Sequence, residues 1–322
     1  MYWPLLKLLL IIPDKEHTMK REQVLDLFRD LKVWKKGDRR APHKPLLLLY
    51  VLGRLQRGET GPVSFDDVDT NVGRLLAEFG PPRKTQPIYP FWYLQNDGLW
   101  ELTNVRPSPD GTLGPCPTKS FIRTRGVAGK LPDEIESVLM TDRELLNQTA
   151  RQILDTNFPN TLHEDIIQAT GLDLATAQKM QGSPEKRARD PRFRDRVLKA
   201  YEYRCAVCGY SIRLGNATIG LEAAHIKWHQ AGGPDEECNG LALCSLHHKL
   251  LDKGAFTLDQ ERRVLVSENA HGGSGFEEWL MNYHGKHIKP PQRTSYYPQS
   301  EFTEWHVSEV FRGRPREYGS AQ

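Results

Sequence analysis

The sequence lacks any apolar stretch that is long enough to cross a membrane. Its most apolar end, residues 1–13, is interrupted by Pro4 and Lys7 and has no small-residue cleavage site of the signal-peptide kind. These absences argue against a membrane-spanning or secreted protein. We therefore expect a soluble, cytoplasmic protein that does not bind membranes.

Cysteine is also scarce, with five residues in a chain of 322, and an odd number cannot all pair. Four of the five lie between Cys205 and Cys244, whereas Cys116 stands alone. Clustered cysteines in a cytoplasmic protein indicate a metal site rather than disulfide bonds. We expect Cys116 to be an ordinary free thiol.

Net charge is low, only +3 with the histidines neutral, so charge alone does not indicate a nucleic-acid partner. Basic residues are nevertheless concentrated in three segments, although one such segment is typical of a solvated helix face or loop. The segments contain Lys32, Lys35, Lys36, Arg39, Arg40 and Lys44; Lys186, Arg187, Arg189, Arg192, Arg194, Arg196 and Lys199; and Lys286, His287, Lys289 and Arg293. Beside a DNA-cleaving motif, three of them would favour contacts with phosphates.

The length predicts about two domains, and no internal repeat is evident. Residues 182–191 are polar and charged, with Ser-Pro and Asp-Pro breaks, and indicate a linker. Met19 heads a helical pattern and is an alternative start to Met1. The predicted organisation is an extension at 1–18, a first domain at 19–170, a linker at 171–190 and a second domain at 191–322.

Apolar residues recur at helical spacing through most of the first domain. After a proline-rich loop, aromatic-rich runs on either side of Asn96-Asp97-Gly98 instead predict a β-hairpin. Helices with a hairpin predict an α-rich, winged-helix-like reader domain. The predicted helices cover residues 19–34, 46–55, 65–79, 132–140, 143–157, 162–170 and 191–201.

Two ligand pairs in the second domain have the spacing of metal knuckles. Cys205 and Cys208 form a Cys-x-x-Cys pair, and Cys244 and His247 form a later Cys-x-x-His pair. Such a set closes all four positions around tetrahedral zinc and can fasten a unit too small to bury an adequate core. We therefore predict a structural Zn²⁺ site. The alternative ligand, Cys238 in place of His247, falls outside the knuckle spacing.

Three further polar residues, His225, Asn239 and His248, are not needed for the zinc. With the knuckles they resemble an HNH endonuclease domain of the ββα-metal type, in the zinc-stapled variant of Mcr-type restriction enzymes. The resemblance covers about the last two fifths of the chain. It implies that His225 is the general base that activates water, that Asn239 holds the hairpin and orients the base, and that His248 binds a divalent metal ion.

The second protein ligand of that metal ion is left open. Many relatives carry Asp or His immediately before the base, but Ala224 stands there and cannot coordinate. Glu222 and Asp252 are the candidates. Hydrolysis of a phosphodiester suits these residue types, because histidine titrates at about pH 6.5 and a cation such as Mg²⁺ or Mn²⁺ stabilises charge on the phosphoryl and leaving oxygens. The alternative is a zinc ribbon that only binds DNA or protein.

The first domain carries a second resemblance. Arg-Arg-Ala-Pro-His-Lys-Pro at residues 39–45 leads into a Leu-rich helix, and Tyr-Pro-Phe-Trp follows at residues 89–92. Over about residues 20–165 the chain resembles the sulfur-binding domain of phosphorothioate-dependent restriction endonucleases. The resemblance implies binding of DNA in which sulfur replaces a non-bridging phosphate oxygen. Sulfur is softer and less hydrated than oxygen, which suits an apolar cup surrounded by cations.

Aromatic and basic side chains are expected at this sulfur site. Tyr89 and Pro90 match a Tyr-Pro pair in the family's pocket. An arginine beyond the predicted hairpin also lines that pocket, and the sequence leaves Arg123 and Arg125 open. The other residues expected at the site, as DNA-contacting donors or pocket wall, are Arg39, Arg40, His43, Lys44 and Tyr93.

Together these patterns predict an α+β protein with an α-rich, winged-helix-like reader and a zinc-stapled ββα-metal nuclease. We expect a type IV restriction endonuclease that binds double-stranded, phosphorothioated DNA and cuts it nearby. Cutting both strands needs two active sites or two visits, so we expect a homodimer. The alternatives are an HNH enzyme that reads methylcytosine or a DNA sequence, and a non-catalytic zinc-containing DNA-binding regulator.

Overall fold

The computed structural model describes residues 19–33, 37–105, 114–174 and 190–317. The predicted extension, most of the predicted linker, and some residues of the basic segments lie outside this part. The basic residues concerned are Lys35, Lys36, Lys186, Arg187 and Arg189. In the described part of the chain, no helix combines the length and the apolar composition that a membrane crossing requires.

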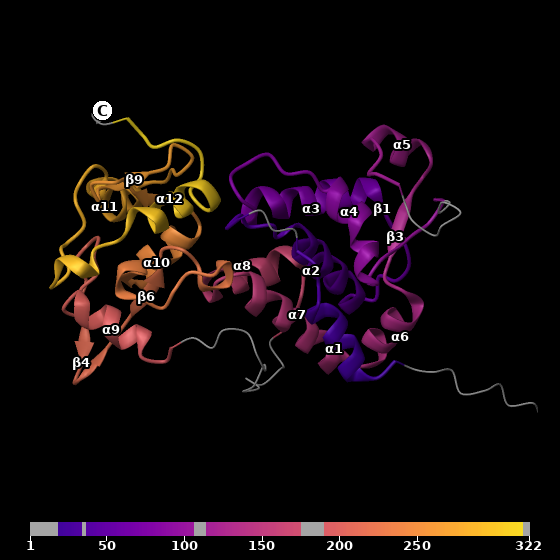
Figure 1. Cartoon of the computed structure of the whole chain (residues 1–322), viewed down its shortest axis with the longest axis horizontal. Coiled ribbons are helices and arrows are strands. Elements are labelled where there is room, and N and C mark those ends of the chain that lie inside the picture. The colour runs from indigo at the N-terminus through magenta and orange to yellow at the C-terminus, as the bar shows by residue number, and fades with distance from the viewer. Residues whose placement is uncertain (1–18, 34–36, 106–113, 175–189, 318–322) are drawn as a thin grey trace, which may run out of the picture.

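The N-terminal part, residues 19–174, is a bundle of helices with one small sheet (Figure 1). Strand β3 (Ala128–Lys130) is central and antiparallel to β1 (Val63–Ser64) and β2 (Glu101–Leu102). The helices are α1 (Arg21–Arg29), α2 (His43–Gln56), α3 (Phe65–Phe79), α4 (Ile88–Tyr93), α5 (Lys119–Thr124), α6 (Asp133–Thr141), α7 (Arg143–Asn157) and α8 (Asn160–Thr170).

The long helices follow the apolar periodicity of the sequence. Helices α3 and α7 begin and end at the predicted residues. Ser64 caps α3, because its side chain accepts a hydrogen bond from the Asp67 N–H. Helix α2 is buried nearly all round and lies at the centre of the bundle, in contact with α3, α4 and α7.

The predicted β-hairpin around Asp97 and Gly98 is wrong. Residues Ile88–Tyr93 form helix α4, and Leu94–Asp97 continue as a 3-10 turn that ends at Gly98, where φ is +71°. Pro90 is compatible with this helix because it lies in the first turn, where its missing N–H has no intrahelical partner. The apolar side chains that the helix buries are at helical spacing: Ile88, Phe91 and Trp92.

The C-terminal part, residues 190–317, is built on a strand–strand–helix unit, as predicted. Strand β6 (Leu221–His225) is antiparallel to β7 (Gly240–Cys244), and α10 (Ser245–Asp252) follows directly. The other elements are α9 (Phe193–Ala200), β4 (Arg213–Leu214), β5 (Ala217–Thr218), β8 (Phe256–Leu258), β9 (Val264–Val266), α11 (Ser274–Trp279) and α12 (Ser300–Glu309). The mixed architecture of helices and small sheets confirms the predicted α+β class.

The two parts meet along α8, which lies against α10 (Figure 1). Trp228, Trp305 and Val310 of the C-terminal part belong to the same apolar cluster as the helices of the N-terminal part. The Trp305 indole N–H donates a hydrogen bond of 2.8 Å to the carbonyl of Asp38. The interface therefore extends the first apolar core, and ion pairs such as Lys227–Asp38 and Lys249–Asp165 also cross it.

A buried ion cluster reinforces this interface. The Arg40 N–H donates to the Glu309 carboxylate at 2.8 Å, and the guanidinium donates to the carbonyls of Glu309 and Phe79 at 3.0 and 2.9 Å. Arg83 donates to both Glu309 carboxylate oxygens, at 2.7 and 2.8 Å. Burial lowers the pKa of Arg40 to about 9, so Arg40 stays charged at neutral pH. Glu309 therefore balances two arginines.

Removal of Glu309 is expected to destabilise the protein strongly. Glu309→Ala leaves Arg40 buried without its counter-charge, and the loss of one member of a buried pair costs about 3–5 kcal/mol in the free energy of unfolding. Urea denaturation measures the effect. The matched control is Glu304→Ala, an exposed site on the same helix; equal stabilities of the two variants would contradict the prediction.

Candidate nuclease site and metal centre

Strands β6 and β7 fix the position of the candidate site. Their register pairs Leu221 with Cys244 at one end and His225 with Gly240 at the other. Helix α10 begins after Cys244 and packs back on both strands. As a result, His225 on β6 and His248 on α10 line the same cavity, although they are far apart in the sequence.

Three cysteines and one histidine converge beside this unit. The ligand atoms of Cys205, Cys208, Cys244 and His247 all lie within 4.8 Å of one another. The His247 Nε2–H donates to the Trp279 carbonyl at 2.8 Å, which leaves Nδ1, 3.0 Å from the Cys244 Sγ, facing the group. Such an outer hydrogen bond fixes the tautomer of a ligating histidine. The donor set fits a closed, tetrahedral structural metal centre, as predicted.

The neighbours Cys238 and Asn239 have other surroundings. The Cys238 Sγ lies 3.6 Å from a Glu236 carboxylate oxygen, and Cys238 is not part of the ligand group in the described residues. Asn239 is fully buried; its Oδ1 accepts from Lys227 N–H at 2.8 Å, and its Nδ2 donates to the carbonyls of Lys227 and Pro234 at 3.0 and 2.9 Å. Asn239 thus fastens the β6–β7 connection and does not line the cavity.

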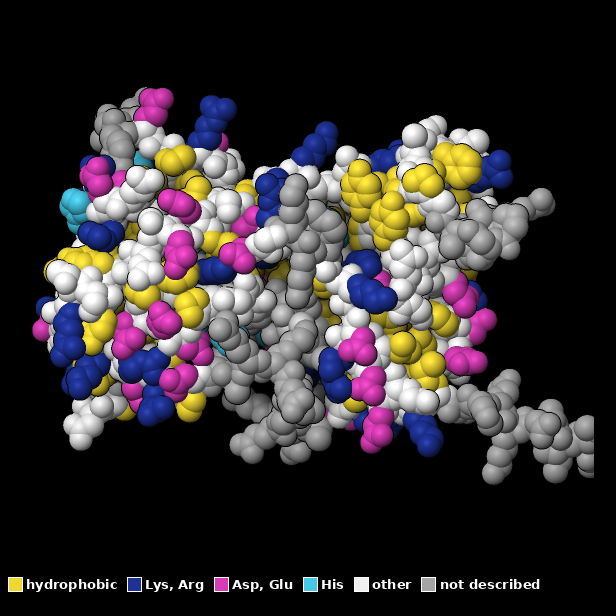
Figure 2. Space-filling view, viewed as in Figure 1, with side chains coloured by type: hydrophobic (Ala, Val, Ile, Leu, Met, Phe, Trp, Pro, Cys, Tyr) yellow, Lys and Arg dark blue, Asp and Glu magenta, His cyan; other side chains and the backbone are white. Residues whose placement is uncertain are grey.

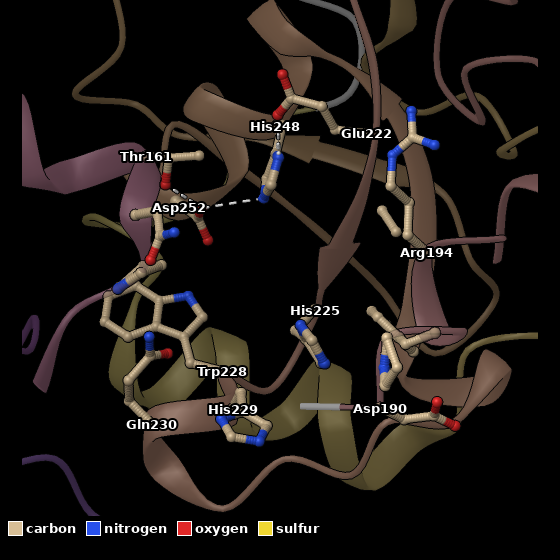
Figure 3. Close-up of a pocket in the computed structure, with 15 residues that line it drawn as sticks. Thr161, Asp190, Arg194, Glu222, His225, Trp228, His229, Gln230, His248 and Asp252 are labelled. Atoms are coloured by element: carbon tan, nitrogen blue, oxygen red, sulfur yellow. Dashed lines mark hydrogen bonds and ion pairs between the residues drawn. The ribbon is translucent and has the colours of Figure 1, made fainter. Parts of the chain in front are cut away.

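The cavity has a volume of about 470 Å³ and is lined by both parts of the chain (Figure 3). The start of α8, residues 159–161, forms part of its wall. Trp228 lines it as well, and the Arg40 guanidinium lies over the Trp228 ring, 3.8 Å from its centre. The candidate nuclease site is therefore completed by the N-terminal part.

His248 is flanked by both carboxylates that the sequence left open as metal ligands. Its Nδ1 lies 2.6 Å from the Glu222 Oε2, and its Nε2 lies 3.3 Å from the Asp252 Oδ2. Burial alone would lower the pKa of His248, but Asp252 and Glu222 outweigh burial and raise the pKa to about 9. Ser245 donates to Glu222 at 2.6 Å, and Thr161 of α8 donates to Asp252. The two carboxylates thus lie at different nitrogens of the ring, and either one with the imidazole is a donor pair that divalent cations accept.

His225 lies on another wall of the cavity. Its Nε2 is 2.7 Å from the Asp235 Oδ1, and its ring stacks on Phe193 with centroids 4.0 Å apart. The preceding Ala224 is fully buried and paired with Leu241, so it offers neither a ligand nor a wall. The structure thus brings His225, His248 and both candidate carboxylates together.

The predicted sulfur-site residues are not all exposed for DNA. Arg40 is buried in the interface, which the sequence did not indicate. Lys44 forms an ion pair with Asp97, and Arg123 forms ion pairs with two aspartates of α3 at 2.6 and 2.9 Å. Burial, together with Arg83, lowers the pKa of His43 to about 4, so His43 is neutral at pH 7.

An exposed aromatic surface lies on α4 and α5 instead. Tyr89 and Tyr93, one helical turn apart, are 51% and 38% exposed, and Phe121 on α5 is 41% exposed. Figure 2 shows hydrophobic side chains gathered over these helices. Arg125 stacks on Phe121 at 5.0 Å, whereas Pro90 is buried; Arg39, in the segment before α2, is also exposed. This surface combines the apolar and cationic groups expected of a sulfur site.

Sequence reasoning missed Thr161, Phe193 and Trp228, which line the cavity, and Asp235, which contacts His225. None belongs to a short motif. The predicted helix at residues 191–201 includes Phe193, but the sequence gave no sign that its ring stacks on His225.

Two family models match the chain. Residues 21–175 match the model of the ScoMcrA-like DNA sulfur-binding domain, and residues 205–259 match that of an HNH endonuclease. No curated protein matches the chain.

Three solved structures each match about half of the chain. The sulfur-binding domain of SprMcrA complexed with phosphorothioated DNA is 26% identical, with a TM-score of 0.40, over 48% of this chain and 96% of that chain. The sulfur-binding domain of ScoMcrA complexed with phosphorothioated DNA is 19% identical, with a TM-score of 0.39, over 46% and 94%. The modification-dependent TagI restriction endonuclease is 22% identical, with a TM-score of 0.30, over 48% and 45%.

The metal centre predicts that purified protein carries about one tightly bound metal ion per chain. Cys208→Ser removes one of four ligands from a half-buried position, so the metal content and the midpoint of thermal unfolding should both fall. Elemental analysis and calorimetry measure the two effects. Cys116→Ser, outside the centre, is the control, and full metal content in Cys208→Ser would argue against the centre.

Proposed function

Because this chain joins a ScoMcrA-like DNA sulfur-binding domain to an HNH endonuclease domain, we propose that it is a modification-dependent restriction endonuclease. It binds phosphorothioated DNA through the first domain and hydrolyses a phosphodiester bond nearby through the second. The observation that carries the proposal is the presence of His225, His248 and two carboxylates in one cavity. We assign residues 19–170 to the reader, 171–190 to the linker and 191–322 to the nuclease.

The roles of the cavity residues follow from their chemistry. His225 is the general base, which takes a proton from the attacking water. His248, with either Glu222 or Asp252 as the second ligand, would hold a divalent cation such as Mg²⁺ or Mn²⁺, which supplies charge stabilisation for the phosphoryl and leaving oxygens when bound. Asn239 keeps the β6–β7 connection in place through its three hydrogen bonds.

One further group of residues supports this chemistry from outside the cavity. Cys205, Cys208, Cys244 and His247 would hold Zn²⁺ as a structural ion, since three thiolates and an imidazole are typical zinc ligands. The proposal includes a homodimer on double-stranded DNA, because one active site cuts one strand at a time.

Replacing the proposed base, His225, tests whether DNA cleavage can be abolished without loss of DNA binding. His225→Ala should lower the cleavage rate by about 10²–10⁴-fold, the usual contribution of a general base, and leave DNA affinity unchanged. Gel-based cleavage and fluorescence anisotropy on one phosphorothioated duplex measure both. His271→Ala, at an exposed loop residue, is the control. A His225→Ala variant that cuts at the normal rate would support a non-catalytic DNA-binding regulator.

Sulfur specificity is tested on α4. Wild-type protein should bind a phosphorothioated duplex more tightly than the same duplex with oxygen. Tyr89→Ala should reduce this affinity ratio about tenfold, because the apolar surface that contacts sulfur is lost. Met140→Ala, which removes an exposed apolar side chain from α6 of the same domain, is the control. Equal affinity of wild-type protein for the two duplexes would exclude sulfur recognition and favour a reader of methylcytosine or of sequence.

A further inference from the structure

The imidazole of His225 is held by a carboxylate ten residues later in the chain, Asp235. The Nε2–Oδ1 distance is 2.7 Å, and the two side chains are only 13% and 14% exposed. A carboxylate at neutral pH can only accept a hydrogen bond, so Nε2 carries a proton in this contact. In the neutral imidazole the lone pair is then on Nδ1, the atom that can accept a proton from water.

Asp235 is itself fixed by the start of α9. Its Oδ2 accepts a hydrogen bond of 2.6 Å from the Asp190 N–H, and its carbonyl accepts one of 2.5 Å from Arg196. Arg196 also donates to the Asp190 carboxylate at 2.5 Å. Burial alone would raise the pKa of Asp235, but the hydrogen bonds from Asp190 and His225 outweigh it and lower the pKa. The group is therefore an ionised carboxylate in a defined orientation.

The ring plane of His225 is fixed by a different contact. Phe193, on the first turn of α9, stacks on the imidazole with an interplanar angle of 16°. Stacking determines the plane, and the bond to Asp235 determines the rotation within that plane. Helix α9 thus supplies the stacking ring and Arg196, and Asp190, just before the helix, also supports the carboxylate.

We propose that Asp235 is the positioning residue of the nuclease base, which fixes the tautomer and orientation of His225 and stabilises its protonated form. The inference rests on the proposed function of His225 as a base. In the step, a water O–H bond breaks and its proton moves to Nδ1 while the water oxygen bonds to phosphorus. The bond from phosphorus to the leaving oxygen breaks, that oxygen takes a proton from solvent, and His225 later returns its proton to solvent.

The test is the pH dependence of cleavage. Asp235→Asn keeps the shape of the side chain but removes its charge, so kcat should fall about 10–100-fold, as for other groups that orient a functional histidine. The lost charge also lowers the pKa of His225, because a nearby carboxylate favours imidazolium. The acidic limb of the kcat profile should therefore move to lower pH, with KM and DNA affinity unchanged.

The control is Glu236→Gln, which removes the adjacent, exposed carboxylate and leaves the His225 contact intact. It should not change kcat or the profile. The other groups near His225 are the same in both variants: His229, with its ring centroid 6.0 Å away, and Asp190, Arg194, Arg196, Glu222, Glu237 and His248. A fall in kcat without movement of the acidic limb would mark a purely structural role for Asp235 and overturn the proposal.

A second readout does not depend on cleavage. Nitrogen NMR of histidine-labelled full-length protein should show His225 as the Nε2–H tautomer, and Asp235→Ala should mix the two tautomers. An unchanged His225 spectrum in Asp235→Ala would overturn the proposal. If the wild-type protein shows this tautomer but cuts no phosphorothioated DNA, the proposed function fails while the positioning contact stands.

Discussion

The convergence of three cysteines and one histidine on a single point is the constraint on which the nuclease site depends. The unit that carries the site has only two five-residue strands and an eight-residue helix. Successive residues of a helix point about 100° apart. Once His247 faces the ligand group, the next residue, His248, must face another side, and here that side is the cavity. The metal centre thus orients a residue that it does not contact.

The N-terminal part also contributes to the cavity that holds His248. The first turn of α8 closes one wall of the cavity, and Thr161 donates to Asp252 beside His248. Arg40, three residues before the start of α2, lies over the ring of Trp228. Trp228, on the wall of the cavity, therefore packs in the apolar cluster of the N-terminal helices, whereas β6 and β7 pack in a core of their own.

Sequence patterns predicted most of the local structure, such as helix bounds and the metal-ligand group. The residues of α3 and α7 and the ligand group follow from periodicity or spacing, and the ββα unit follows from the resemblance to HNH endonucleases. The hairpin prediction failed because aromatic residues and Asp-Gly favour strands and turns, whereas burial at Ile88, Phe91 and Trp92 favours a helix. Here the burial of apolar side chains outweighed the local preference for strands and turns.

Contacts between residues that are distant in the sequence could not be predicted from the sequence. Arg40 looked like a DNA contact because basic residues surround it, yet its partner Glu309 is 269 residues away. Asp235 lies in no motif, since its relation to His225 depends on how the β6–β7 connection folds. In both cases the sequence showed the chemical type of the side chain but could not predict its partner.

The most direct test of the account is to map cleavage on a duplex that carries one phosphorothioate at a defined position. A second duplex of the same sequence carries the sulfur one helical turn away, and a third carries none. The account predicts cuts at a fixed distance from the sulfur, which move with it and are absent from the third duplex. Cuts that stay at the same sequence position, or that appear equally without sulfur, would contradict it.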